Sequence, residues 1–433
     1  MAQSLNDLLL STVSTDFAVR IANLRKEWSF AEFLKSHGHI ADTVRAIVAD
    51  VASRGDDAVV EYTNKFDNVD FTAKDFLVPQ SQLKDAFVNL DASLLTSLRK
   101  SIENVQLYQS EICIASKPTY SGIKYNPVKR AGICVPGASA PLPSTAIMTI
   151  VPAVVAGVKE IVVVSPPRHH HTINPVILGL CYELGIEEVY RVSGAQAVAA
   201  LAWGTETIKK VDIIVGPGNN YVQMAKKEVF GLVKIDSFAG PSDVIIIAND
   251  QAKPSWVAAD MLSQAEHAPG AALLLTDSAK IAEAVIAELE IQLKKLSRAD
   301  ETRKCLFAHS AVIITKDLDE SIAFANDFAA EHLEIQCGHD SDDVEKKIIN
   351  AGAIFVGPYS PVAVGDYIAG PSHTLPTRCT SKFFSALTCN DFLKSSSLIR
   401  YSKDDLHKDA DDIVRIANTE GLTAHAESIN KRL

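Results

Sequence analysis

The sequence predicts an α/β fold with two parallel sheets, and three observations lead to that prediction. Short apolar runs rich in β-branched residues alternate with segments of helical length, which is typical of parallel strands joined by helices. The chain has 433 residues, which is too long for a single hydrophobic core of ordinary size, so two or more domains are expected. The stretch Ala239-Gly240-Pro241 separates two strand–helix series and marks a boundary between the sheets.

Each expected strand is nearly continuous in apolar residues and is bounded by Gly, Pro or Asp. The strands are expected at 161–165, 188–191, 212–215, 244–247, 272–275, 311–315 and 353–356. Helices are expected between them at 145–157, 195–203, 221–228 and 255–267. Residues 1–110 are expected to be mainly helical. The strand pattern ends after about residue 380, so 404–419 and 423–433 are expected to form a helical tail.

Composition argues against several classes of protein. The net charge is −11 with no basic stripe, which disfavours a nucleic-acid partner. The most apolar stretch, 131–158, is broken by prolines, so no membrane span is expected. The seven cysteines are scattered without a CxxC pair, and the first residues lack the pattern of a secretory leader. We therefore expect reduced thiols and a cytoplasmic protein.

One glycine-rich turn has the position of a phosphate-binding loop. Gly216-Pro217-Gly218-Asn219 follows an expected strand and precedes an expected helix, where backbone amides can meet a phosphate. The proline removes one donor, however, and many such turns contain glycine for shape alone. The turn at 135–141 has the same ambiguity, and no GxGxxG motif follows any strand.

The helix at 255–267 ends with polar residues at metal-ligand spacing. Gln264 and His267 are three positions apart and share one helix face, with Asp260 about two turns before His267. Carbonyl oxygen and imidazole at this spacing could hold one metal ion, with the aspartate behind them. A polar helix end without a metal is the competing interpretation.

Further candidates for chemistry lie towards the C-terminus. Glu331 and His332 are an adjacent acid and imidazole suited to proton transfer, although neighbours on a strand share a site only where the backbone bends. Asp366 and His373 lie in a loop rich in glycine and proline. His425 lies in the tail. By themselves these residues could also be a helix-terminal pair, a turn aspartate and a surface histidine.

Read together and in order, six segments resemble the signature blocks of the histidinol dehydrogenase family. They are GPGNNYVQMAKKEV, AGPSDVIIIA, DMLSQAEHAPG, AAEHLEIQ, GDYIAGPSHTLPT and EGLTAHAESINKRL. The similarity extends from about residue 20 to the C-terminus, and six ordered motifs are far more specific than any one of them.

The resemblance implies one zinc ion per subunit, held by Gln264, His267, Asp366 and His425. It implies that the substrate binds this metal and is also contacted by Ser242, His332, His373 and Glu420. In the family the C-terminal tail enters the active site of the neighbouring subunit of a homodimer, so a composite site is expected.

The chemistry implied by the resemblance is a four-electron oxidation of L-histidinol to L-histidine through L-histidinaldehyde, with two NAD, as the last step of histidine biosynthesis. His332 would take the alcohol proton, and Glu331 would activate the water that adds to the aldehyde. Gln196 and Asn219 match positions that contact NAD. Cys134 stands where the family usually has a tyrosine that contacts NAD. Three further departures are Ala138 for glycine, Ala330 for proline and Asp243 for glutamate.

The resemblance also implies two incomplete Rossmann-like domains with small helical extensions at both ends. The expected parts are an N-terminal extension at 1–24, an NAD-side domain at 25–240, a metal and catalytic domain at 241–378, and a tail at 379–433. A related zinc dehydrogenase acting on another small alcohol, such as a sulfonated diol, is the alternative within the enzyme class. A zinc hydrolase and a non-catalytic binding protein are the alternatives outside it.

Overall fold

The computed structural model describes residues 4–119, 121–137, 141–238, 240, 242–267 and 269–433. Ala239 and Pro241 of the expected boundary, and Ala138, lie outside the described residues. The chain divides into two compact units, one formed by Met1–Ile112 and Val128–Phe392, the other by Cys113–Pro127 and Leu393–Leu433. No helix among the described residues is long and apolar enough to cross a bilayer.

The first sheet of the larger unit has five parallel strands in the order β5-β4-β3-β6-β7. Their bounds are β3 (Arg130–Cys134), β4 (Glu160–Val164), β5 (Glu188–Tyr190), β6 (Ile213–Val215) and β7 (Lys234–Ile235). Renumbered from β3, this is the 3-2-1-4-5 order of a Rossmann-type sheet without its sixth strand, and the order reverses between β3 and β6. A ligand of such a sheet binds outside the carboxyl ends of the strands at that point.

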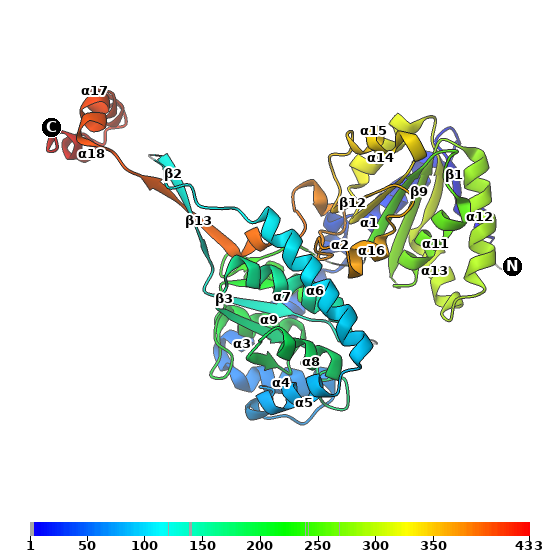
Figure 1. Cartoon of the computed structure of the whole chain (residues 1–433), viewed down its shortest axis with the longest axis horizontal. Coiled ribbons are helices and arrows are strands. Elements are labelled where there is room, and N and C mark those ends of the chain that lie inside the picture. The colour runs from blue at the N-terminus through cyan, green and yellow to red at the C-terminus, as the bar shows by residue number, and fades with distance from the viewer. Residues whose placement is uncertain (1–3, 120, 138–140, 239, 241, 268) are drawn as a thin grey trace. The chain divides into compact units, whose positions relative to one another are not determined.

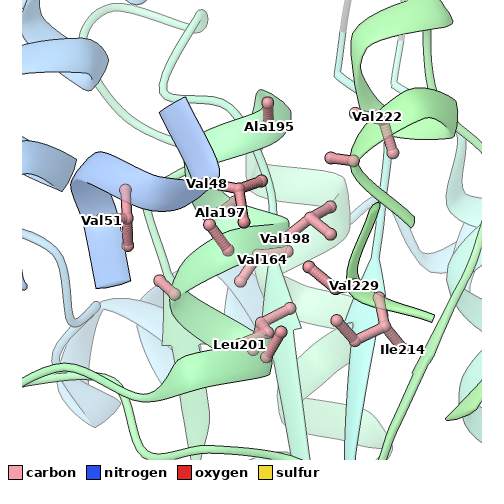
Figure 2. Close-up of a cluster of buried hydrophobic side chains, with 14 of the residues drawn as sticks. Val48, Val51, Val164, Ala195, Ala197, Val198, Leu201, Ile214, Val222 and Val229 are labelled. Atoms are coloured by element: carbon pink, nitrogen blue, oxygen red, sulfur yellow. The ribbon is translucent and has the colours of Figure 1, made fainter. Parts of the chain in front are cut away.

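Helices α7 (Pro143–Ala156), α8 (Pro175–Glu183), α9 (Gly194–Trp203) and α10 (Asn220–Val229) alternate with these strands. Before them come α3 (Gly38–Arg54), α4 (Asp56–Asp67), η2 (Ala73–Asp75), α5 (Gln80–Val88) and α6 (Ala92–Ile112). Helix α9 is apolar all round and buried from Ala195 to Ala202, as expected of a helix enclosed by its neighbours. Figure 2 shows Val48 and Val51 of α3 in one cluster with Val198 and Leu201 of α9.

The second sheet has six parallel strands in the order β1-β10-β9-β8-β11-β12. Their bounds are β1 (Leu9–Ser11), β8 (Ser242–Ala248), β9 (Gly270–Thr276), β10 (Ala311–Ile314), β11 (His332–Gln336) and β12 (Ala353–Val356). Strands β1, β9 and β12 of this sheet are labelled in Figure 1. Apart from β1, the order again follows 3-2-1-4-5, with the reversal between β8 and β11. The predicted α/β fold with two incomplete Rossmann-like parallel sheets is confirmed.

Helices also surround the second sheet, and both of its faces are buried. The elements are η1 (Leu5–Leu8), α1 (Phe17–Trp28), α11 (Pro254–Ala265), α12 (Ala279–Leu293), α13 (Ala299–His309), α14 (Leu318–Phe328), η3 (Gly338–Asp340), α15 (Ser341–Glu345), α16 (Val362–Tyr367) and η4 (Thr380–Lys382). Helix α2 (Phe30–Ser36) packs against the apolar cluster of the first sheet, and η5 (Cys389–Phe392) contacts α7. Val244 and Ile246 of β8 belong to one apolar cluster, and Ile245 and Ile247 belong to another. Alternate residues of a strand point to opposite faces, which explains why β8 is apolar at consecutive positions from Val244 to Ala248.

The smaller unit consists of a two-stranded antiparallel ribbon and two helices. Strands β2 (Ser121–Pro127) and β13 (Leu393–Ile399) pair with Leu393 opposite Pro127, and the chain continues into α17 (Lys403–Thr419) and α18 (Thr423–Asn430). The prediction that strands end after about residue 380 is therefore wrong. Strand β13 reads LKSSSLI and is mostly exposed, so it lacks the buried apolar run that marks the other strands.

The domain bounds at 24, 240 and 378 stay predictions. The first sheet is built from residues 130–235, and the second from β1 together with residues 242–356. The short edge strand β1 lies inside the segment for which only a helical extension is predicted, and at three residues it is too short for a sequence pattern.

Candidate active site

Seven of the residues selected from the sequence line one cavity of about 900 Å³ in the larger unit. They are Asn219, Ser242, His267, Glu331, His332, Asp366 and His373. Gln264, Gln196 and Cys134 do not line this cavity. Glu420 and His425 belong to the smaller unit.

Strand pairing explains why residues far apart in sequence meet at this cavity. Ser242 is the first residue of β8 and His332 the first of β11, and these two strands are neighbours, with His332 opposite Val244. Ser242 pairs with Gly270 at the start of β9, and His267 lies three residues before that glycine. The acid–base residues therefore collect at the amino ends of the central strands of the second sheet.

His332 is held in a defined tautomer by a backbone carbonyl. Its Nδ1 lies 3.0 Å from the carbonyl oxygen of Asp243, and because a carbonyl only accepts, Nδ1 must carry the proton. Nε2 is then the unprotonated nitrogen. It is buried, has no hydrogen-bond partner among the described residues, and lies 3.8 Å from Oδ1 of Asp366. Burial lowers the pKa of His332 to about 4, so the ring is a neutral proton acceptor near neutral pH.

Glu331 precedes β11 and lies beside the same histidine, with 3.6 Å between its Oε2 and His332 Nδ1. The Ser242 hydroxyl donates to Oε2 at 2.5 Å and the Asp243 amide donates to the same oxygen at 3.0 Å. Burial raises the pKa of Glu331 well above its ordinary 4.5, and the neighbouring Asp243 carboxylate raises it further. A carboxylate with a raised pKa in a cavity is suited to act as a general base.

Asp243 organises both residues, a role that the sequence analysis missed. Its carbonyl fixes the His332 ring, its amide donates to Glu331, and its Oδ1 accepts the Glu331 amide at 2.6 Å. Burial raises the pKa of Asp243 to about 7. Two of the three contacts are made by backbone atoms, which carry no residue-specific signal in a sequence.

Replacing Asp243 by asparagine is expected to shift the acid limb of the pH–activity profile to lower pH. Asparagine keeps an oxygen to accept the Glu331 amide but removes the negative charge that raises the Glu331 pKa. The Glu331 pKa then falls, so the carboxylate form persists to lower pH. The check is the pH dependence of kcat/KM for the substrate aldehyde in the two proteins. An acid limb at the wild-type pH would contradict this assignment.

Asp366 and His373 come from α16 and the loop that follows it. His373 Nδ1 donates to the Asp366 carbonyl at 3.0 Å, and its Nε2 lies 3.4 Å from the Thr145 hydroxyl. Burial lowers the pKa of His373 to about 4 and raises that of Asp366 to about 6. Glu334, two positions beyond His332 on the same face of β11, is fully buried and accepts the Val362 amide that begins α16 at 2.9 Å. The strand carrying His332 thus also fixes the helix carrying Asp366.

The chemistry of the predicted zinc ligands fits that ion. Gln264 is buried, and its Nε2 has no hydrogen-bond partner among the described residues, so no protein contact from this nitrogen fixes the orientation of the amide whose oxygen would bind the metal. Burial lowers the pKa of His267, which favours the neutral imidazole that binds metals. Asp366 adds an anionic oxygen. The described residues contain no group of three His, Cys, Asp or Glu placed to hold a metal. Of the predicted ligands of these types, His267 and Asp366 belong to the larger unit and His425 belongs to the smaller one.

Glu420 and His425, the remaining residues predicted for the metal and substrate, are exposed in the smaller unit. Glu420 is the C-cap of α17, and His425 lies in the first turn of α18. Neither side chain is used for packing within its own unit, which leaves both available for a ligand.

The candidate nucleotide residues surround the reversal point of the first sheet. Cys134 ends β3 and the Gly216–Asn219 turn follows β6, the two strands between which the order reverses. Asn219 caps α10, its Oδ1 accepting the amides of Tyr221 and Val222 at 3.0 and 3.1 Å. The Cys134 thiol is buried, and burial raises its pKa to about 12, so it is not a reactive group.

Gln196 is also buried, at the start of α9 after β5. Neither polar atom of its side chain has a hydrogen-bond partner among the described residues. A buried amide without partners needs an explanation, and a bound molecule is one.

A buried ion pair fixes the glycine-rich turn. Lys226 of α10 and Asp236 are 0% and 3% exposed and in contact. The ammonium donates to the Gly216 carbonyl at 3.1 Å, and Asp236 Oδ2 accepts the Gly216 amide at 2.7 Å. Gly216 has φ +109°, and a Cβ there would clash with the carbonyl oxygen of Cys134. The pair thus holds both backbone polar groups of Gly216, a position in the turn that must be glycine.

Replacing Lys226 by methionine is expected to destabilise the protein by about 3–5 kcal/mol, because it leaves the Asp236 carboxylate buried and unpaired. The free energy of unfolding from urea titration measures this. Lys226→Met combined with Asp236→Asn should recover much of the loss, because no lone charge remains buried. A single-variant loss below about 1 kcal/mol would show that water reaches the pair.

Comparison with known proteins places the chain in a family. The model of the family "Histidinol dehydrogenase" matches residues 33–433. The chain is 44% identical to histidinol dehydrogenase of Rhodopirellula baltica, over 90% of this chain and 86% of that protein, and 43% identical to that of Bacillus subtilis, over 90% and 92%. The crystal structure of histidinol dehydrogenase from Elizabethkingia anophelis superposes with a TM-score of 0.86 at 33% identity, covering 90% of this chain and 91% of that one. The chain belongs to the histidinol dehydrogenase family.

Proposed function

We propose that this chain oxidises L-histidinol to L-histidine in two successive hydride transfers to NAD, with L-histidinaldehyde as the intermediate. Family membership supports the reaction, and the observation that carries it is the state of His332. Its Nδ1 is protonated and fixed by a carbonyl, its bare Nε2 has no hydrogen-bond partner among the described residues, and the residue lines the cavity. An alcohol needs such a proton acceptor when it loses hydride.

In the first oxidation His332 Nε2 accepts the hydroxyl proton while hydride leaves the carbinol carbon. The ring is neutral beforehand, because burial holds its pKa near 4. Once protonated, it lies beside the carboxylates of Glu331 and Asp366, at 3.6 and 3.8 Å, which stabilise the positive charge.

In the second oxidation Glu331 activates the water that adds to the aldehyde. The hydrogen bonds from Ser242 and Asp243 both go to Oε2, and no hydrogen bond from the described residues reaches Oε1. Oε1 is therefore the oxygen available to a water molecule. Once His332 has released its first proton to solvent, the hydrated aldehyde transfers hydride to a second NAD while Nε2 again accepts a hydroxyl proton. The resulting carboxylic acid loses its remaining proton to give the carboxylate.

A zinc ion would be held by Gln264, His267 and Asp366 of the larger unit and by His425 of the tail. When bound, it supplies a template that orients the amino alcohol. Glu420, close to His425 in sequence and exposed, would pair with the substrate ammonium. The tail lies in a separate unit whose polar residues face solvent, which supports a homodimer in which it completes the partner's site.

NAD would bind at the reversal point of the first sheet, near Asn219 and Gln196. The position of the Gly216–Asn219 turn after β6 supports this, since nucleotides of Rossmann-type sheets bind there. A cytoplasmic location is proposed because the reaction consumes NAD and the cysteines of the described residues form no disulfide.

The test is the yield of NADH from limiting L-histidinol with excess NAD and zinc-loaded protein. We expect two NADH per histidinol and L-histidine as the product. Absence of NADH from L-histidinol, with NADH from a sulfonated diol under the same conditions, would refute the substrate while keeping the reaction class. Removal of zinc by a chelator should abolish turnover, and added zinc should restore it.

A further inference from the structure

Arg378 lines the cavity and has most of its hydrogen-bonding capacity unused. A guanidinium carries five N–H donors. The described residues offer this one a single long hydrogen bond, 3.5 Å from Nη1 to the Glu27 carbonyl. They place no carboxylate oxygen within 4.0 Å of it, so it forms no ion pair there. Asp243 and Glu27 act on it only at longer range.

The guanidinium is nevertheless held in place. Its Cζ lies 4.3 Å from the centroid of the Phe33 ring, which is itself 3% exposed and stacked near Phe30 and His37. The Arg378 carbonyl accepts the Phe30 amide at 3.3 Å. Stacking on an aromatic ring fixes the plane of the guanidinium while leaving its N–H edge free.

The backbone at this position is strained. Arg378 and the next residue, Cys379, have φ values of +56° and +63°, in the left-handed region that favours glycine. Two consecutive residues with side chains in this region are uncommon. Such strain persists where the surrounding structure enforces it and is concentrated at ligand sites. Here it accompanies the positioning of a cationic side chain at the cavity wall.

We propose that Arg378 binds an oxyanion in the active-site cavity. Its flat, pre-oriented fork matches the paired oxygens of a phosphate or a carboxylate. The identity of the oxyanion rests on the proposed function. It is either the diphosphate of the dinucleotide or the carboxylate formed by the second oxidation. Both are reaction components, and the cavity lining, which is rich in acidic side chains, offers an anion only Arg378 and the exposed Lys26 as permanent cations among the described residues.

Two matched ligand pairs separate these sources when binding is measured by calorimetry on the intact protein. ADP and adenosine differ in the diphosphate, and L-histidine and L-histidinol differ in the carboxylate. Arg378→Met should weaken either ADP or L-histidine at least tenfold, with adenosine and L-histidinol changed less than twofold. Arg378→Lys, which keeps the charge but not the fork, should lie between. The matched control is Arg45→Met, which removes a 60% exposed arginine that does not line the cavity.

Arg378→Gly separates ligand binding from structural support. Glycine relieves the positive φ, so its melting temperature should equal or exceed that of the wild type, while oxyanion affinity falls as in Arg378→Met. Oxyanion affinities unchanged within twofold in both variants would overturn the proposal. So would a wild-type protein that binds ADP no better than adenosine and L-histidine no better than L-histidinol. Failure of the proposed function appears separately, as no NADH from L-histidinol, and the ADP comparison still decides the role of Arg378.

Discussion

Replacing His332 by alanine is expected to lower kcat for L-histidinol oxidation by about 10²–10⁴-fold, the usual contribution of a positioned general base. The imidazole is the group whose bare Nε2 is buried at the cavity without a protein partner. Its loss leaves water to accept the alcohol proton. The measurement is the initial rate of NADH formation at saturating L-histidinol and NAD, with zinc content confirmed for each protein.

The KM for L-histidinol and the affinity for NAD should change far less than kcat, because the effect is on the transition state. His339→Ala is the matched control, since that side chain is exposed on η3 and does not line the cavity. Protonation of His332 should not slow the wild-type first oxidation as the pH falls from 7 towards 5. The base is neutral above its pKa of about 4 and is lost only as the pH falls through that value. A variant that retains more than a tenth of wild-type kcat would exclude His332 as the base.

The parallel sheets could be predicted because buried strands require apolar residues, and apolar runs can be seen in the sequence. Both faces of β8 and β9 are covered, so the middle of each strand is an unbroken apolar run, and the strands predicted at 244–247 and 272–275 fall inside the observed ones. The exposed strand β13 is stabilised by backbone pairing to β2, and its serines do not form an apolar run that would predict a strand. A strand that buries little cannot be recognised from hydrophobic periodicity.

The candidate site likewise has residues that could be predicted from the sequence and properties that could not. Glu331 and His332 could be selected from their chemistry, and the resemblance placed them in order. The tautomer of His332 depends on the backbone carbonyl of Asp243, and the charge states of both residues depend on burial, neither of which a side-chain pattern encodes. No sequence motif pointed to Arg378. It was selected because of its positive φ and because it forms no ion pair among the described residues. Both features depend on long-range packing.

Replacing Glu331 by glutamine is expected to separate the two oxidations. Glutamine keeps an oxygen to accept the Ser242 and Asp243 donors, so the site should remain folded. It cannot take a proton from water, so hydration of the aldehyde should slow by about 10²–10⁴-fold. His332 is untouched, and the alcohol step should proceed. The NADH yield per L-histidinol should therefore fall from two towards one in a single-turnover experiment with excess enzyme and NAD.

The aldehyde itself is the second measurement, trapped with hydroxylamine and identified by mass spectrometry. Glu345→Gln, in helix α15 and outside the cavity, is the matched control and should give two NADH without trapped aldehyde. Two NADH at the wild-type rate from Glu331→Gln would assign water activation to another group.

The wild-type enzyme should show the same separation at low pH. Burial and Asp243 hold the pKa of Glu331 well above its ordinary value, while burial holds that of His332 near 4. As the pH falls, the carboxylate base is protonated first and the imidazole base remains. The yield should then drift from two NADH towards one before the alcohol step fails. Burial raises the pKa of a carboxylic acid and lowers that of a histidine. Any site with one buried carboxylate base and one buried histidine base is therefore expected to lose the carboxylate base first as the pH falls.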